Sequence, residues 1–210
     1  MGMSDERKAE LKNICQLLFD AHLETERLFL RLFEESDFEA FYAFRGDESV
    51  CRMAGYSLLS RREDVRKVFD AVLGEYDFLF HTFAVVRKAD GQVLGSFVPG
   101  YYPFLERDES LRRLRGLSLS FSLAPAYQRQ GYMTELLSRL LQWFFREQRF
   151  DFVNCGYFET NQASAALQRK LGFQYYMRHL ISWEDRELPV MEQLLTRERY
   201  DSLHPRGESA

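Results

Sequence analysis

A strand, a long helix and a second strand follow one another in the C-terminal half of the chain, and this order constrains the fold most. From Leu117 to Leu123, large apolar residues alternate with serines, which is typical of a strand with one buried face. Apolar residues at helical spacing predict a helix from Gly131 to Gln148, and a second strand follows over Asp151 to Phe158. Strands joined in this way lie parallel in one sheet, with a right-handed crossover. We therefore expect a mixed α/β domain.

The remaining pattern supplies further elements of the same domain. Before the serine-lined strand, we predict a strand at 27–33, two helices opened by the capping boxes 36–39 and 60–63, and a hairpin over 82–98, followed by a charged loop at 105–115. After the βαβ unit, we predict a helix at 162–171 ended by Gly172 and two strands at 173–183 and 188–195. The domain is expected to span residues 23–201, with a polar tail at 202–210.

An amphipathic helix is expected in the N-terminal extension, residues 1–22. It begins at Ser4, and its apolar stripe consists of Leu11, Ile14, Cys15, Leu18 and Phe19. Docking of this stripe on the main domain is the favoured interpretation. A homodimer contact and a lid over the substrate are the alternatives.

Charge and residue usage exclude several classes of protein. The formal net charge of −4 provides no general attraction to nucleic acid or to anionic membranes, so neither is expected as a partner. The three cysteines are scattered and the four histidines lack ligand spacing, so we expect reduced thiols and no metal site. The N-terminus is too polar for a signal peptide, and no apolar run reaches membrane-spanning length. A cytoplasmic location is expected.

The turn from Gln128 to Thr134 is the main candidate for a binding site. It lies where the long helix begins, so its first backbone N–H groups lack intrahelical partners and the helix dipole adds positive charge. Such a turn can bind phosphate without a lysine, and Gly131 permits close approach of the backbone. By itself the signal is weak, because many helices begin with glycine and threonine.

The order of the segments is more specific than the turn alone. A strand ending at Leu123, the turn with Gly131, the helix, the second strand, and then Asn161, Ser164 and 171–173 together resemble the GNAT superfamily of acetyltransferases. The segments 25–31 and 126–137 are similar to the ribosomal-protein-alanine N-acetyltransferase subfamily. The resemblance covers roughly residues 25–200. It implies a central twisted mixed sheet with splayed parallel strands 4 and 5, flanked by helices.

The resemblance also assigns roles to individual residues. Leu123 would pair with the pantetheine arm of acetyl-CoA as an added strand does, and Asn161 would hydrogen-bond that arm. Ser164 would lie near the thioester sulfur and protonate the departing thiolate. The turn that would hold the pyrophosphate comprises Gln128, Arg129, Gln130, Gly131, Tyr132, Met133 and Thr134.

Some positions depart from the family pattern. Met133 replaces a small residue and needs space, so its side chain is expected to point either into the core or toward the ligand. Arg129 stands where the subfamily usually has glycine. Ser118 and Gln168 occupy the places of the glutamate base and the tyrosine acid that are common in the superfamily. The general base is therefore not assigned by resemblance.

Several side chains are candidates for that base, because an amine attacks a thioester only when it is unprotonated. Glu159 follows a strand end next to Asn161 and is the candidate that we place nearest the cleft. His81, His179 and Glu184 are alternatives by residue type, with a structural role favoured for His179.

The leading hypothesis is transfer of an acetyl group from acetyl-CoA to a primary amine by direct attack in a ternary complex. The acceptor is either a protein N-terminus or a small molecule. No cysteine is placed to suggest a covalent intermediate, since Cys155 lies within a predicted strand. The alternative is a non-catalytic acyl-CoA-binding sensor or interaction module, which the missing glutamate and tyrosine would suit.

Overall fold

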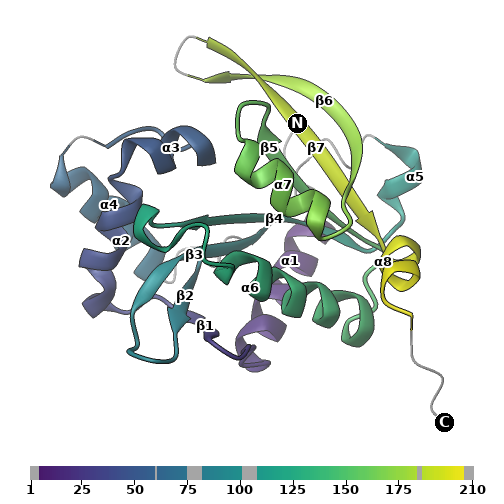
Figure 1. Ribbon diagram of the computed structural model, residues 1–210, viewed down its shortest axis with the longest axis horizontal. Helices are drawn as coiled ribbons and strands as arrows, with labels where there is room; N and C mark the ends of the chain where they lie inside the picture. The colour runs from purple at the N-terminus through teal and green to yellow at the C-terminus, as the bar shows by residue number, and fades with distance from the viewer. Residues whose placement is uncertain (1–4, 60, 75–81, 101–107, 184–185, 206–210) are drawn as a thin grey trace.

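The computed structural model describes residues 5–59, 61–74, 82–100, 108–183 and 186–205. These residues form one seven-stranded sheet in the order β1-β2-β3-β4-β5-β7-β6, with helices packed on it (Figure 1). The strands are β1 (Leu28–Leu32), β2 (Phe83–Arg87), β3 (Val93–Gly100), β4 (Gly116–Leu123), β5 (Phe152–Phe158), β6 (Gln174–Trp183) and β7 (Arg186–Thr196). The helices are α1 (Asp5–Asp20), α2 (Phe38–Arg45), α3 (Glu48–Ala54), α4 (Arg62–Leu73), α5 (Glu109–Arg112), α6 (Tyr132–Gln142), α7 (Gln162–Lys170) and α8 (Arg197–Leu203).

The parallel pair predicted from the βαβ order is β4 and β5, and it is short. Its register runs from Gly116 opposite Phe152 to Ser118 opposite Asn154 and ends there. β4 continues along β3 as far as Leu123, while β5 continues along β7 as far as Phe158. The two strands therefore separate beyond Ser118, and their facing edges leave the sheet open at this place. This confirms the expected splay.

Alternate residues of β2 show how the two faces of the sheet are covered. Phe83 and Val85 belong to a core cluster that includes apolar residues of α1 and α6. Ala84 and Val86 belong to a second cluster with residues of α2 and α4. Because side chains alternate along a strand, the two clusters lie on opposite faces. The sheet is thus sandwiched between two apolar layers.

The N-terminal helix packs on the first of these layers. Ile14 and Leu18 are almost fully buried in the cluster that contains the α6 residues. Phe19, the last residue of the predicted apolar stripe, does not belong to the buried face, because it is 44% exposed. Ser4, the expected start of this helix, lies outside the described residues.

The predicted capping boxes are wrong or fall outside the described residues. A 3-10 turn at Glu35–Asp37 precedes α2, and its capping box joins Glu34 and Asp37 rather than Ser36 and Glu39. The reason is an ion pair: the Asp37 carboxylate accepts the Glu34 N–H and both ends of the Arg31 guanidinium, at 2.5 and 2.9 Å. Ser60, of the second predicted box, is not among the described residues. Its helix α4 begins at Arg62.

Three short helices fall where the sequence pattern predicts none. α3 begins after Asp47, whose side chain accepts the Val50 N–H, and ends at Gly55 in the left-handed region. α5 lies within the predicted charged loop and is capped by Asp108. α8 follows β7 and extends into the predicted tail. Helices this short bury too few residues to show periodicity, and only their capping residues signal them.

The long predicted helix is divided, and the second hairpin strand is extended. α6 ends at Gln142 and continues as a π-helical turn over Trp143–Glu147. β3 runs through Pro99 to Gly100, which pairs with Ser118, so the proline does not end the strand. α7 ends as predicted, with Gly172 at a φ of 91°.

Candidate functional site

The turn before α6 presents backbone N–H groups at an exposed surface. Gly131 is the N-cap of α6 with a φ of 82°, and Arg129 also has a positive φ, of 60°. The hydrogen bond from the Glu135 N–H to the Gly131 carbonyl is the first i to i−4 hydrogen bond of the helix. The N–H groups of Tyr132, Met133 and Thr134 precede it and have no carbonyl four residues back within the helix. Their positive dipole end can bind an anion.

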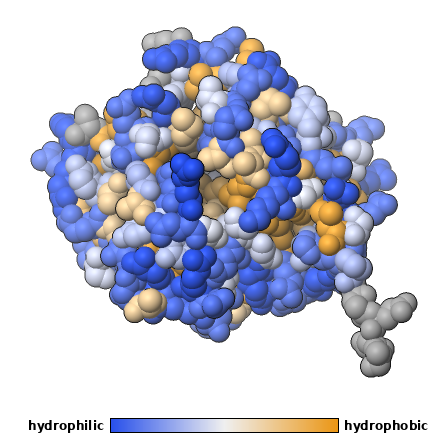
Figure 2. Space-filling view, in the orientation of Figure 1, coloured by the Kyte–Doolittle hydropathy of each residue, from blue (hydrophilic) through white to orange (hydrophobic). Residues whose placement is uncertain are grey.

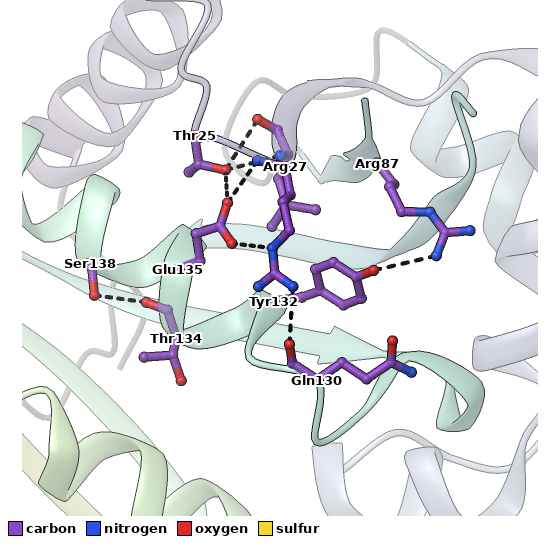
Figure 3. A network of polar contacts seen from close by, with 9 residues as sticks. Thr25, Arg27, Arg87, Gln130, Tyr132, Thr134, Glu135 and Ser138 are labelled. Carbon is purple, nitrogen blue, oxygen red and sulfur yellow. Dashed lines mark hydrogen bonds and ion pairs between the residues drawn. The ribbon is translucent and has the colours of Figure 1, made fainter. Parts of the chain in front are cut away.

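A set of hydrogen bonds holds this turn against the start of β1 (Figure 3). The Glu135 carboxylate accepts from the Thr25 hydroxyl at 2.5 Å, from the Arg27 N–H at 2.9 Å and from Arg27 Nε at 2.6 Å. Arg27 also donates from Nη1 to the Gln130 carbonyl at 3.2 Å. The segment 25–27, which the family resemblance had singled out, therefore acts on the turn itself.

Cations surround the tyrosine at the first position of α6. The Arg27 guanidinium lies 4.4 Å from the Tyr132 ring centroid, and Arg87 donates to the Tyr132 hydroxyl at 3.4 Å (Figure 3). Burial by itself would raise the pKa of Glu135, but the hydrogen bonds from Thr25 and Arg27 outweigh it and leave that pKa below its usual value. Glu135 is therefore ionised at neutral pH, and the ion pair with Arg27 persists.

Met133 resolves one of the departures from the family pattern. Its side chain is 7% exposed and belongs to the main core cluster together with Leu136 and Leu137. The methionine thus fills the core and leaves the backbone of the turn exposed. A larger residue at this position is compatible with an anion site for that reason.

A pocket of about 280 Å³ opens where β4 and β5 separate. It is lined by residues 53–56 at the end of α3, 119–121 of β4 and 155–158 of β5, together with Asn161, His179, Ile181, Val190 and Glu192. In the orientation of Figure 1, the surface is hollowed near the middle of the molecule, and apolar residues border the hollow (Figure 2). The walls are mainly apolar and aromatic, with a few polar groups among them.

A chain of buried polar side chains crosses four strands to reach this pocket. The Ser118 hydroxyl donates to the Asn154 side-chain oxygen at 2.9 Å, and Asn154 Nδ2 donates to Glu192 Oε2 at 2.9 Å. Glu192 Oε1 lies 3.0 Å from His179 Nε2. Ser118, Asn154 and Glu192 are each at most 2% exposed.

The sequence interpretation did not find Asn154 or Glu192. Each interrupts an otherwise apolar strand segment, and a buried polar residue in such a segment is the signal that would have found them. Their proximity follows from strand register, since Asn154 lies opposite Leu194 and His179 opposite Val190 on β7.

The structure brings Asn161 to the pocket. Its side-chain oxygen accepts the Ser164 N–H at 3.0 Å and caps α7, while its Nδ2 donates to the Met53 carbonyl at 3.2 Å. Asn161 therefore connects the ends of α3 and α7 across the opening. Ser164 lies in the first turn of α7, where its hydroxyl oxygen accepts from Gln168 Nε2 at 3.0 Å. The Ser164 side chain is not among those that line the pocket.

Leu123 lies at the other end of the exposed β4 edge. Its carbonyl accepts from Gln128 Nε2 at 3.0 Å. The side chain of the first residue of the turn thus holds the end of β4, and the two candidate cofactor segments are joined directly.

The candidate bases from the sequence are distributed differently from what we expected. Glu159 is exposed, forms an ion pair with Arg178 at 3.5 Å and does not line the pocket. His179 lines the pocket beside Glu192. His81 and Glu184 lie outside the described residues.

Cys155 forms part of the pocket floor as a neutral thiol. It is 2% exposed, and its thiol contacts the Leu119 carbonyl at 3.5 Å. Burial, and next the negative charge of Glu192, raise its pKa far above the usual value. A thiol in this state is a poor nucleophile.

The described portion of the chain offers neither a metal-binding cluster nor a membrane-spanning helix. It contains no group of three or more His, Cys, Asp or Glu side chains arranged to hold a metal ion. None of its helices combines the length and the apolar character needed to cross a membrane.

The comparison with known families matches the model described as "Acetyltransferase (GNAT) domain" over residues 27–174. The chain belongs to the GNAT acetyltransferase family. The match contains β1, the α6 turn, the splayed strands and α7. Of the candidate site, Thr25 and the β6–β7 contributions lie outside it.

Individual GNAT relatives are distant in sequence and close in fold. The chain is 23% identical over 153 residues to YoaA of Bacillus subtilis (strain 168), described as an uncharacterized N-acetyltransferase, covering 72% of this chain and 82% of that one. A spermidine N-acetyltransferase from Vibrio cholerae, in complex with CoA and spermine, has a TM-score of 0.64 at 15% identity, covering 82% and 97%. RimL, a ribosomal L7/L12 alpha-N-protein acetyltransferase, has a TM-score of 0.65 at 15% identity, covering 83% and 93%.

Proposed function

We propose that this GNAT acetyltransferase transfers the acetyl group of acetyl-CoA to a primary amine. The observation that carries the proposal is the adjacency of two features along β4. An exposed helix N-terminus with a left-handed glycine follows the strand, and a pocket opens beside the strand where β5 departs. The first feature suits a diphosphate, and the second suits a reacting thioester and its acceptor.

The residues present fit coenzyme A. The N–H groups of residues 129–134 would hold the pyrophosphate, with Gln128 and the Arg27–Glu135 pair keeping the turn in place. The edge of β4 from Leu119 to Leu123 would pair with the pantetheine arm as a further strand does. In this complex Asn161 would bind the same arm from the start of α7. The arm would thereby lead from the turn toward the pocket.

Direct attack by the amine suits the pocket better than a covalent route. The thiol of Cys155 is neutral and buried, so it does not provide an acyl-accepting nucleophile. In a ternary complex the amine nitrogen attacks the thioester carbonyl, the C–S bond breaks, and the thiolate takes up a proton. The Ser164 hydroxyl supplies this proton to the thiolate. That hydroxyl accepts a hydrogen bond from Gln168, so its own hydrogen is available to another partner.

Glu159 remains a candidate base through a bridging water, since it follows β5 at the same end as Asn161. Its ion pair with Arg178 opposes that role, because the pair favours a carboxylate that stays bound to the guanidinium.

The acceptor is a primary amine of either a small molecule or a protein N-terminus. Two fold neighbours represent the two kinds, one a spermidine N-acetyltransferase and the other a ribosomal L7/L12 alpha-N-protein acetyltransferase. At 15% identity these neighbours support the fold and leave the choice to experiment.

Release of free CoA thiol from acetyl-CoA, measured with a panel of primary amines and an N-terminal peptide, tests the proposal. We expect at least one amine to accelerate release and to be recovered as its acetamide. Tight binding of acetyl-CoA without acceleration by any amine would instead support a non-catalytic acyl-CoA sensor.

A further inference from the structure

A buried carboxylate lies in the pocket, and the transfer chemistry described above does not use it. Glu192 on β7 is 2% exposed and lines the pocket beside Cys155 and Gly156. Among the described residues, Asn154 Nδ2 donates to Glu192 Oε2 at 2.9 Å, and His179 Nε2 lies 3.0 Å from Glu192 Oε1. An alanine Cβ at position 156 would lie 2.8 Å from both carboxylate oxygens. Glycine at this position is what lets the carboxylate reach the pocket.

The environment of Glu192 favours binding of a cation. A carboxylate removed from water is costly unless a positive charge accompanies it, and no described lysine or arginine lines the pocket. The effect of its charge is visible on the neighbouring Cys155, whose thiol pKa it helps to raise. The β6 side chain that contacts Glu192 is His179, whereas the preceding residue, Arg178, pairs with Glu159.

We propose that this pocket is the acceptor subsite, in which Glu192 binds the ammonium form of a primary amine and His179 receives its proton. The inference rests on the proposed acetyl transfer and names the group that binds and activates the acceptor. Asn154 is a positioning residue, because it holds the carboxylate and is held in turn by Ser118.

The proton transfer keeps the charge of the site constant. The substrate enters as an ammonium that contacts the Glu192 carboxylate and the His179 ring. Transfer of one proton from nitrogen to the His179 ring leaves a neutral amine and an imidazolium, and Glu192 balances either cation. The amine lone pair then forms the C–N bond while the C–S bond breaks with its electron pair on sulfur. The nitrogen's remaining surplus proton replaces the one that the Ser164 hydroxyl gives to that sulfur, and His179 releases its proton to solvent, which yields the amide and the free thiol.

The walls indicate the kind of amine. Tyr56, Phe121, Tyr157 and Phe158 line the pocket, so the group that follows the ammonium is surrounded by rings. Rings of this kind favour an apolar stem and add cation–π attraction to the charged head. We therefore expect a primary amine on an apolar or aromatic stem, such as phenethylamine, to be preferred over putrescine, whose second ammonium has no described carboxylate in the pocket.

The central experiment compares Glu192→Gln with Glu187→Gln, which removes an exposed carboxylate from the same strand. With acetyl-CoA and phenethylamine, the first change should lower kcat/KM about 100-fold, in the range of a lost buried charge partner of the ammonium, and the second should leave it unchanged. Calorimetric titration of phenethylamine into the CoA complex provides a readout besides activity. The affinity for phenethylamine should fall at least about tenfold in Glu192→Gln, while the affinity for CoA stays at the wild-type value.

A second variant displaces the carboxylate without removing its charge. Gly156→Ala should force Glu192 out of position and reduce kcat/KM. Gly100→Ala is the control: Gly100 also lies in a strand, but an added Cβ there would be 3.9 Å from its nearest neighbour, the Ser118 carbonyl oxygen, so kcat/KM should not change. Gly156→Ala keeps the test informative if Glu192→Gln does not fold. The added Cβ would displace only the flexible end of the Glu192 side chain, so the backbone need not move and the variant should fold.

The pH profile separates proton transfer from simple binding. His179→Gln should lose about 100-fold in kcat near neutral pH, and the loss should shrink toward pH 10, where solvent supplies neutral amine. The other titratable groups that line the pocket are Glu192, Cys155, Tyr56 and Tyr157. A His179→Gln loss that is equal at all pH values would overturn its role as the proton acceptor.

Failure of this inference differs from failure of the proposed function. An inactive wild-type protein with every amine contradicts the acetyl transfer itself. An active wild type whose Glu192→Gln and Gly156→Ala variants keep full kcat/KM contradicts the acceptor subsite, as does a Glu159→Gln variant that alone abolishes activity. Preference for putrescine over phenethylamine contradicts the assignment of the stem.

Discussion

Arg27, just before β1, and Glu135, in the first turn of α6, form an ion pair of 2.6 Å that joins the N-terminal segment to the candidate cofactor turn. The same arginine donates to the Gln130 carbonyl and lies over the Tyr132 ring. The position of the turn therefore depends on a residue more than a hundred positions away in the chain. Substitution of either residue should therefore alter the position of the turn.

Replacing Glu135 with glutamine should loosen the turn. The variant keeps the shape of the side chain but loses charged hydrogen bonds with Thr25 and Arg27, at a cost of about 1–3 kcal/mol in unfolding free energy. We expect the Kd of CoA to rise as well. Chemical denaturation and calorimetry measure the two effects, and an unchanged Kd would show that the turn does not need this support.

The same pair predicts a dependence of stability on pH. The pKa of Glu135 is lowered from its ordinary value of 4.5 in the folded state, because its hydrogen bonds outweigh the opposing effect of burial. Its contribution is therefore complete above pH 4.5 and is lost as the pH falls through the folded pKa. The difference in unfolding free energy between the native protein and Glu135→Gln should shrink below pH 4.5. Urea titrations between pH 7 and pH 3 measure it, and a difference that grows with acidification would contradict the assignment.

Gly131→Ala should weaken CoA binding. At a φ of 82° an alanine is strained by about 1–2 kcal/mol, and relief of that strain would turn the N–H groups away from the ligand. Gly91→Ala is the matched control, because Gly91 has a φ of 70°, has nothing within 4 Å of an added Cβ and lies in the β2–β3 turn. Both variants should lose stability, but calorimetry should show reduced CoA affinity only for Gly131→Ala.

Ser164→Ala should lower turnover more than cofactor affinity. Loss of the hydroxyl removes the proposed proton donor to the thiolate, which predicts a kcat about 100-fold lower. Gln168→Met, which removes the amide that donates to Ser164, should produce a smaller loss in the same direction. Steady-state kinetics with separate measurement of the CoA Kd distinguishes the cases. Equal losses in kcat and affinity would argue for a purely structural serine.

Cys155→Ala should retain acetyl transfer. The thiol is buried and its pKa is raised, so it does not carry the acetyl group in a direct-attack mechanism. Intact mass measured after mixing with acetyl-CoA should show no acetylated protein in either form. An acetylated wild type together with an inactive alanine variant would establish a covalent route instead.

Much of the candidate cofactor site could be predicted from local signals. The alternation in β4, the glycine before α6 and the Asn161 cap of α7 each depend on residues a few positions apart, so their pattern is visible along the chain. The segment containing Arg27 was recognised by resemblance, but its hydrogen bonds to Glu135 were not foreseen. Long-range partners of this kind carry no periodic signal.

The amino-acid sequence alone determined the βαβ order, the parallel strand pair and the exposed turn at Gly131, because hydrophobic periodicity and helix-end chemistry act over short distances. Only the tertiary structure decided that Ser118, Asn154, Glu192 and the half-buried His179 meet in one chain of polar contacts. These residues come from four strands, and their contact depends on strand order and register, which are set by packing of the whole sheet. The same packing placed the end of α3 over the opening and left Glu159 outside it.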